Sequence, residues 1–476
     1  MEELALRYAM VQWRNGQMSL CDGFWAREVG DLWPAWMRVA DRLLEDEELI
    51  DPIYRAQGQR WQLSRTRGRK QTPAEVVLRM LVLKHANNWS FEETEHQVRA
   101  NIVCREFARV GLGRVPDAKV IGKIAKLLGP EAVEKVHRRL IEVAKQEGAI
   151  QGRRLRVDTT VVETNIHYPT DSSLLSDGAR VLTRLTKKVA AAVGGLAQGV
   201  RDRMRTVRRK AVAIAISSRR KGPEGEKQRR KHYEKLLTVT RQVVNQANRV
   251  ARQVGEMSKV KRAVARPLLH QMATMAERTK QVIRQTKARI FKGNTKAPDK
   301  VVSMFEPHTE VIRKGKASKP TEFGKMVKIQ EAENQVIVDY EVYTEKPNDS
   351  DLLVESVQIH EELLDRVPDL VAADAAFYSA ANEKALEEKG VKRVAVPNRR
   401  TTSAARRKMQ KERWFKNGQR WRTGCEGRIS VLKRRHGLNR SRYHGQDGIE
   451  KWVGLGVIAD NLISLGRLIP MPKAVA

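Results

Sequence analysis

Three acidic residues occur next to apolar or helical sequence patterns, and their positions suggest a chemical role. Asp158 interrupts apolar and β-branched residues in RLRVDTT, and Asp374 ends the nearly all-apolar run LVAADAAF. Glu426 lies in the helical pattern of RTGCEGRISVLKRR. An unpaired carboxylate is costly to bury, whereas carboxylate oxygens are ligands that Mg²⁺ prefers. Together the three acids suit a pair of divalent ions about 4 Å apart, the arrangement that cuts phosphodiester bonds.

Each acid also has an ordinary interpretation, and none of them decides the matter alone. Asp158 and Asp374 are equally explained as loop-edge or helix-capping residues. Glu426 follows Arg422 by four residues and precedes Lys433 by seven, so a helix places all three on one face. Such a face is either a surface salt-bridge ladder or a set of basic groups that grip phosphates beside a metal-bound carboxylate.

The charge of the chain favours a polyanionic partner. In 476 residues there are 91 Lys and Arg against 56 Asp and Glu, a net charge of +35. Nucleic acid is the commonest partner of such a protein, with anionic lipid and ribosome assembly as the competing readings. Residues 176–300 carry 33 basic and 8 acidic side chains, whereas residues 1–60 carry 7 and 11. This concentration indicates a local binding surface.

Cysteine usage and hydropathy bear on the compartment. Cys21, Cys104 and Cys425 are far apart and odd in number, which fits neither a disulfide framework nor a zinc site. No run of 18 apolar residues is present, and the first residues do not resemble a signal peptide. We therefore expect a cytoplasmic, nucleoid-associated protein that does not contact a membrane.

Four domains are expected, beginning with two helical segments. Residues 1–60 predict short helices, and residues 61–150 predict a helix-turn-helix-like DNA-binding domain. Its helices are expected to begin at Pro73 with Thr72 as N-cap, at Ser90-Phe91-Glu92-Glu93 as a capping box, after Pro116-Asp117 and after Gly129-Pro130. The basic residues that lead into it, expected to contact DNA, are Arg67, Arg69 and Lys70. A purely structural helical domain is the alternative.

The remaining chain predicts an α/β domain interrupted by a basic insertion. Residues 151–175 and 297–470 alternate strand and helix patterns, which indicates a mixed sheet flanked by helices. Residues 176–296 predict two or three long helices forming an antiparallel hairpin. The strands expected after the insertion are Val301–Phe305, Thr309–Arg313, a hairpin turning at Glu333-Asn334, a strand ending at Asp374, and Val391–Pro397.

Several long motifs in this order resemble bacterial insertion-sequence transposases. They are RVDTTVVETNIHYPTDSSLL, KPTEFGKMVKIQEAENQVI, DYEVYTEKPNDSDLL, LVAADAAFYSAANE, GCEGRISVLKRRHGLNRSRYHG and WVGLGVIADNL. The chain is most similar in these motifs to the ISNCY group, within the RNase H-like DDE superfamily. The resemblance covers roughly residues 60–470, including the helical segment before the α/β domain.

The resemblance implies a catalytic site and a reaction. Asp158, Asp374 and Glu426 would be the DDE triad holding two Mg²⁺ or Mn²⁺ ions, and Arg422 and Lys433 match the arginine and lysine of a Y-R-E-K signature. Gln419 stands where that signature has its tyrosine. The implied function is a transposase that binds the terminal inverted repeats of its element, cleaves DNA and transfers the strand. Its partners would be the transposon ends, the target duplex and at least one further copy of itself.

Two other functions fit the same residues. An RNase H-like nuclease would cleave DNA without joining it, and a strand-transfer assay separates the two. An inactive or domesticated transposase would bind DNA as a regulator. The intact acidic triad argues against this second alternative.

Overall fold

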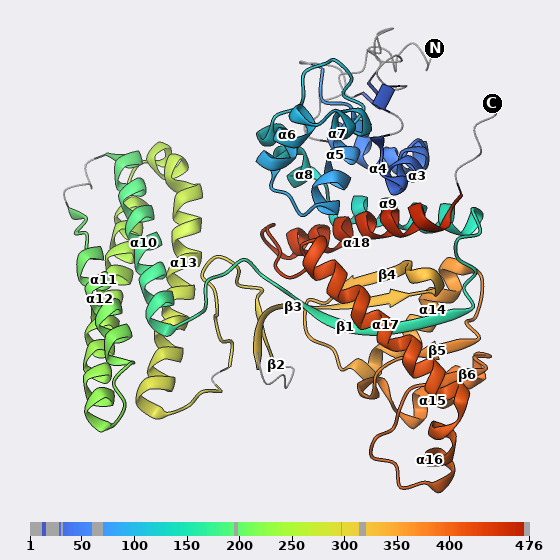
Figure 1. The fold of residues 1–476 in the computed structure, drawn as a ribbon. Helices are drawn as coiled ribbons and strands as arrows, with labels where there is room; N and C mark the ends of the chain where they lie inside the picture. Colours follow the sequence, from blue (N-terminus) through green and yellow to red (C-terminus); the bar gives the residue numbers. More distant parts are fainter. Residues whose placement is uncertain are drawn as a thin grey trace. The chain divides into compact units, whose positions relative to one another are not determined.

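The chain folds into a mixed α/β structure with two compact units. The computed structural model describes residues 12–15, 28–29, 32–59, 70–194, 199–296, 298–313 and 320–470. One unit is Ile166–Val311, and the other is formed by the chain before and after it. Figure 1 shows a helical bundle in the first unit and a sheet covered by helices in the second. No helix in the described ranges is long and apolar enough to span a membrane.

The N-terminal part of the sheet-containing unit is helical, and α5 lies at its centre. All thirteen residues of α5 are buried. Leu78 and Leu81 pack in one core with Ile50 of α4 and with Leu140 of α9. The helices here are α3 (Ala35–Leu43), α4 (Glu47–Gly58), α5 (Ala74–Ala86), α6 (Phe91–Ala100), α7 (Ile102–Phe107), α8 (Ala118–Leu127) and α9 (Pro130–Gln146).

Local sequence signals set most of these helix ends. Ser90 and Glu93 form the expected capping box, with a Glu93 N to Ser90 Oγ distance of 3.0 Å. The start of α5 differs by one residue from the expectation, because Pro73 is the N-cap and Thr72 is not. The backbone N–H groups of Ala74 and Glu75 instead donate to the carbonyls of Gln12 and Trp13, at 2.8 and 3.0 Å. These tertiary hydrogen bonds therefore satisfy backbone N–H groups at the helix start, the role expected of a side-chain cap.

A six-stranded mixed sheet lies below these helices. Its order is β2-β3-β1-β5-β6, with β4 paired to β3. β3 is antiparallel to β1 and to β4, whereas β1, β5 and β6 run parallel. The strands are β1 (Arg154–Glu163), β2 (Glu310–Arg313), β3 (Thr321–Glu331), β4 (Ile337–Val342), β5 (Leu370–Ala372) and β6 (Arg393–Ala395).

Helices cover the sheet. α14 packs Val357 against Val157 and Val371, and α17 packs Phe415 against Ala372 and Ala395. The long helix α18, buried over most of its length, contacts α3, α5, α9 and β4 and so joins the N-terminal helices to the sheet. The helices are α14 (Leu353–Leu364), α15 (Ala380–Glu388), α16 (Ala404–Lys411), α17 (Arg413–Arg435) and α18 (Gln446–Leu468).

The basic insertion is a four-helix bundle, and the expected hairpin of two or three helices was wrong. Leu182, Val207, Leu236 and Val282, one from each helix, share a single apolar core. A second pair of helices is needed because each long helix has an apolar face that a two-helix hairpin leaves partly exposed. The helices are α10 (Asp171–Val193), α11 (Met204–Ser217), α12 (Pro223–Gly255) and α13 (Lys259–Lys292).

The strand expected at Val301–Phe305 is absent. The side chain of Gln285 on α13 bonds both the N–H and the carbonyl of Val301, each at 2.9 Å. The Ser303 hydroxyl accepts the N–H groups of Phe305 and Glu306, at 3.2 and 3.0 Å. The backbone groups that a strand would pair in a sheet are thus satisfied by side chains of the bundle unit.

Candidate active site

Asp158 lies in β1, and Asp374 lies two residues beyond the end of the neighbouring parallel strand β5. Arg156 of β1 pairs in register with Ala372 of β5. Each aspartate follows its paired residue by two positions, which is the spacing that returns a strand to the same face of the sheet. Asp158 lies within β1, and Asp374 follows β5 as the N-cap of a short 3-10 turn.

The two aspartates are held differently. One oxygen of Asp158 accepts the backbone N–H of Thr159 at 2.7 Å, and the Asp158 side chain is 18% exposed. One oxygen of Asp374 accepts the N–H of Ala376. Both carboxylates therefore have a backbone donor that fixes their rotamer.

Arg422 contacts both Glu426 and Asp158, and so links Glu426 to the aspartates. Both residues are on α17, and the Nη2 atom of Arg422 lies 2.7 Å from Glu426 Oε1. The Nη1 atom of Arg422 lies 3.8 Å from Asp158 Oδ2. Arg422 is thus placed between two of the three predicted carboxylates. Glu426 is 55% exposed, which leaves room for its side chain to change rotamer.

The described residues contain no cluster of three His, Cys, Asp or Glu side chains already arranged around a metal ion. The chemistry of the donors nevertheless fits Mg²⁺ or Mn²⁺, since Asp158 and Asp374 supply hard oxygen atoms and Glu426 can turn toward them. The neighbouring Arg422 neutralises part of this negative charge. The geometry brings Asp158 and Asp374 to one edge and leaves Glu426 paired with Arg422.

Gln419 anchors α17 to the strands that position Asp374. Its side-chain amide donates to the carbonyl of Ala373 at 3.1 Å and also to the carbonyl of Ala395. Gln419 occupies the place of the tyrosine in the Y-R-E-K pattern, three residues before Arg422. In this chain the residue at that place bonds the sheet backbone.

A buried ion pair that the sequence analysis missed lies under the same helix. Arg156 pairs with Glu331 of β3, donates to the carbonyl of Trp421, and stacks 4.8 Å from the centre of the Trp421 ring. Both charged side chains are almost fully buried, at 4% and 0% exposure. Burial raises the pKa of Glu331, while the adjacent Arg156 opposes this shift. Glu331 lies in KIQEAEN, and its partner Arg156 is distant in the sequence. Nothing in the local sequence therefore indicates that the two residues form an ion pair.

The remaining predicted contact residues are scattered. Lys433 is partly buried, two helical turns beyond Glu426 on α17. Lys70 is exposed just before α5, and Arg67 and Arg69 lie outside the described residues. Because α5 itself is buried all round, it cannot enter a DNA groove, whereas α6, α8 and α9 each have an exposed face.

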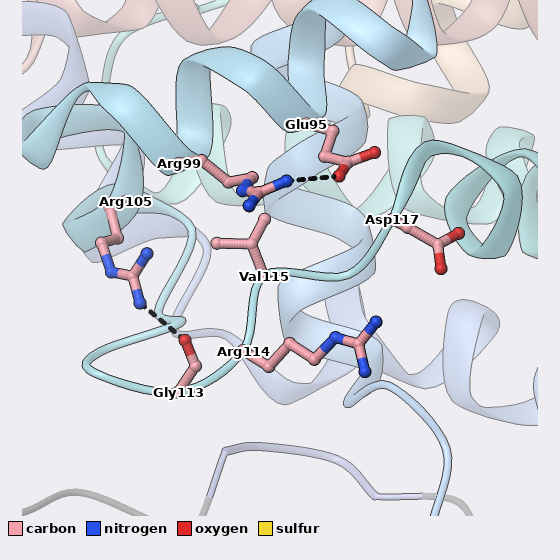
Figure 2. A pocket seen from close by; sticks show the side chains of 7 residues that line it. All are labelled: Glu95, Arg99, Arg105, Gly113, Arg114, Val115 and Asp117. Atoms are coloured by element: carbon pink, nitrogen blue, oxygen red, sulfur yellow. Dashed lines mark hydrogen bonds and ion pairs between the residues drawn. The ribbon is translucent and has the colours of Figure 1, made fainter.

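A polar pocket of about 300 Å³ lies between α6, α7 and the start of α8 (Figure 2). Three arginines line it. Arg99 pairs with Glu95 at 3.2 Å, and Arg105 donates to the carbonyls of Gly111 and Gly113, each at 2.6 Å. Arg114 is exposed beside them. Guanidinium groups held in this way suit phosphate oxygens.

The bundle unit concentrates positive charge where α11 meets α12. Burial and the neighbouring Lys235, Arg209 and Lys231 lower the pKa of Lys210. The pKa of His232 is lowered for similar reasons, by burial and then by Lys210, Lys235 and Lys231. Like charges that depress each other's pKa form a surface to which a polyanion would bind favourably.

Two stretches of the chain match known protein families. Residues 36–127 match the family described as transposase domain (DUF772), and residues 302–462 match the family described as transposase DDE domain. The second match contains Asp374, Glu426 and the whole of α17. These two matches show that the chain belongs to the DDE-type insertion-sequence transposases.

A further relative is an uncharacterized protein, ORF8 in the nfe locus of Rhizobium meliloti. It is 29% identical over 127 residues, which cover 25% of this chain. This chain spans 61% of the length of that relative. No solved structure matches the chain.

Proposed function

We propose that this transposase binds the terminal inverted repeats of its element, cleaves DNA at the ends and joins them to a target. The observation that supports the proposal is the register of β1 and β5, in which Arg156 pairs with Ala372, two residues before Asp158 and Asp374 respectively. The order of antiparallel β3 beside parallel β1, β5 and β6, with α17 across one face, supports an RNase H-like core.

In this proposal Asp158, Asp374 and Glu426 hold two Mg²⁺ or Mn²⁺ ions. When bound, such ions activate the attacking oxygen and stabilise the leaving oxygen of the phosphodiester. Arg422, which lies between Asp158 and Glu426, would exchange its contact with Glu426 for a contact with a DNA phosphate. Glu426 would then turn toward the two aspartates.

The same carboxylates would serve both chemical steps. Water attacks at the transposon end and leaves a 3′-hydroxyl, and that hydroxyl attacks a target phosphate in line and displaces its 3′ oxygen. No serine or tyrosine nucleophile is required. Two transposon ends in one reaction favour assembly of at least two copies of the chain on DNA.

A strand-transfer assay tests this function. Duplex oligonucleotides that carry the terminal repeat with a recessed 3′-hydroxyl are incubated with the protein, a supercoiled target plasmid and Mg²⁺. The proposal expects oligonucleotides covalently joined to the plasmid, and loss of joining when the 3′ end is a dideoxynucleotide. On uncut duplexes, in which flanking DNA follows the terminal repeat, cleavage without joining would identify a nuclease instead. Binding without either reaction would identify a DNA-binding regulator.

A further inference from the structure

A second site lies at the other edge of the parallel strands, where β1, β5 and β6 begin. It is a groove of about 960 Å³, walled on one side by the first turns of α17. Four residues from Arg154 to Asp158 along β1 correspond to about 13 Å. The groove is thus separate from the three carboxylates but belongs to the same sheet and the same helix.

The groove is lined by positive charge. Arg153 and Arg154 lie at the start of β1, Lys392 and Arg393 at the start of β6, with Arg153 and Lys392 immediately before these strands, and Arg413 begins α17. All five side chains are exposed. Among the residues that the structure describes, the guanidinium groups of Arg153, Arg154 and Arg413 have neither a hydrogen bond nor an ion pair. They are available to an anionic ligand.

The acidic groups of the groove are already engaged. Asp369 pairs with Lys392 at 2.8 Å and with Arg366 at 3.0 Å. Glu412 accepts the indole N–H of Trp414 at 2.6 Å. The remaining field in the groove is therefore positive, although two carboxylates contribute to its lining.

Two indole rings add a second kind of contact. Trp414 and Trp421 both line the groove and are only partly buried. The guanidinium of Arg393 lies 5.7 Å from the Trp414 ring centre. The Trp421 ring already carries the Arg156 guanidinium on one face. The indole rings can stack on a flat ring, and the unpaired arginines beside them can bind a phosphate. The groove therefore suits a ligand that has both groups.

From these contacts we infer that the groove binds unpaired nucleotides of a DNA strand. A base inside a duplex is stacked on its neighbours and cannot reach an indole, whereas an unpaired base stacks on any exposed aromatic ring. The about 13 Å along β1 between Arg154, in the groove, and Asp158 corresponds to about four nucleotides stacked at 3.4 Å. The groove would therefore hold a strand that is separated from its complement near the cleaved phosphate. The inference rests on DNA being the substrate, as proposed above.

Binding without metal isolates this contact from the reaction. The full-length protein is titrated, in EDTA, into a fluorescein-labelled single-stranded oligonucleotide of mixed sequence and into the corresponding duplex. We expect Trp414→Leu to weaken single-strand binding about tenfold, the loss that one stacking contact predicts, and to change duplex binding by less than about twofold. Trp414→Phe keeps a ring at the site and should restore most of the single-strand affinity.

Charge variants test the groove without disturbing a packed ring. Arg413→Ala should lower the slope of log affinity against log salt by about 0.7 for the single strand. Lys416→Ala removes another exposed charge of α17 that does not line the groove, and it should leave this slope unchanged. A base analogue such as 2-aminopurine should be quenched by wild-type protein and not by Trp414→Leu.

The possible failures are distinguishable. Equal loss of single-strand and duplex binding in Trp414→Leu, or no loss in either, overturns the groove while the transposase function stands. Wild-type protein that binds neither form of DNA would overturn the proposed function and the groove together.

Discussion

The side chains of Asp158 and Asp374 owe their position to strand pairing, and Glu426 owes its position to a helix. We expect Asp158→Asn, Asp374→Asn and Glu426→Gln each to lower DNA cleavage by about a hundredfold or more. An amide removes the negative charge that holds a divalent ion, and loss of even an outer partner of such a site costs about 10- to 100-fold. Cleavage of labelled ends in Mg²⁺ measures the effect.

Binding of the same ends provides the control for these variants. Phosphate contacts depend on lysine and arginine, so the affinity of each amide variant for DNA in EDTA should stay near that of the wild type. Wild-type cleavage by any one variant would remove that residue from the proposed triad.

Lys84 shows how an individual charge responds to the fold. Its side chain is 2% exposed, and its Nζ lies 4.5 to 5.3 Å from the ring centres of Phe91, Tyr443 and Trp452. Burial, together with the nearby charge of Arg442, lowers the pKa of Lys84 to about 7. The three rings favour the ammonium form and partly offset the cost of burying it.

This pKa makes stability depend on pH with a defined sign. Between pH 7 and about 10 the unfolded chain still holds the Lys84 proton that the folded chain has released. The contribution of Lys84 to the free energy of unfolding therefore rises as pH rises through this window. We expect Lys84→Met to be more stable than wild type at pH 6 by at least about 1 kcal/mol, a difference that shrinks toward pH 10. Urea unfolding at several pH values measures it, and a difference independent of pH would contradict the assigned pKa.

At the scale of elements, the position of α17 depends on contacts beneath it. Gln419 bonds the carbonyl of Ala373, and Arg156 bonds the carbonyl of Trp421. Nearer its end, Arg428 pairs with Asp460 of α18 at 2.8 Å, and both are buried. Two of these contacts lie in the N-terminal half of α17 and the third in its C-terminal half, so together they orient the helix that carries Arg422 and Glu426.

The pair of Arg156 and Glu331 gives a test of this view. Glu331→Leu leaves the Arg156 charge buried without its partner and should lower the free energy of unfolding by about 3–5 kcal/mol. The double variant Arg156→Met with Glu331→Leu removes both charges and should recover most of that loss. Denaturant unfolding of the single and double variants measures the difference. Equal destabilisation in both would mean that packing, and not the lost ion partner, dominates.

At the scale of the whole molecule, the bundle unit has its own apolar core. That core draws its residues from the four bundle helices and from Met304 of the same unit. Replacement of 171–292 by a Gly/Ser linker should therefore leave the other unit folded. The replaced segment begins at the start of α10 and ends at the end of α13, because a cut inside α10 would expose part of its apolar face.

We expect this replacement to lower the slope of log DNA affinity against log salt by several units and to reduce strand transfer sharply. Each phosphate contact contributes about 0.9 to the slope of log affinity against log salt. Filter binding at several salt concentrations, with circular dichroism as the folding control, measures the change. An unchanged slope accompanied by a shift to monomer in sedimentation would show that the bundle is a dimerisation arm.

The sequence by itself determined the elements whose signals are local. The Ser90 and Glu93 capping box, the turn at Glu333-Asn334 and the apolar run before Asp374 each contain their own physical cause, and all of them appear in the structure. The family, too, was predicted correctly from motifs in their order along the chain. The assignment of the triad remains a prediction.

Only the tertiary structure decided which distant groups meet. The register of β1 and β5, in which Arg156 pairs with Ala372, and the ion pair of Arg156 with Glu331 join residues separated by a whole bundle unit. Val301 likewise has a strand-like sequence but bonds a glutamine side chain on α13. Backbone groups are satisfied by whichever partner folding brings near, and burial sets the energy of a charge, so neither follows from local sequence.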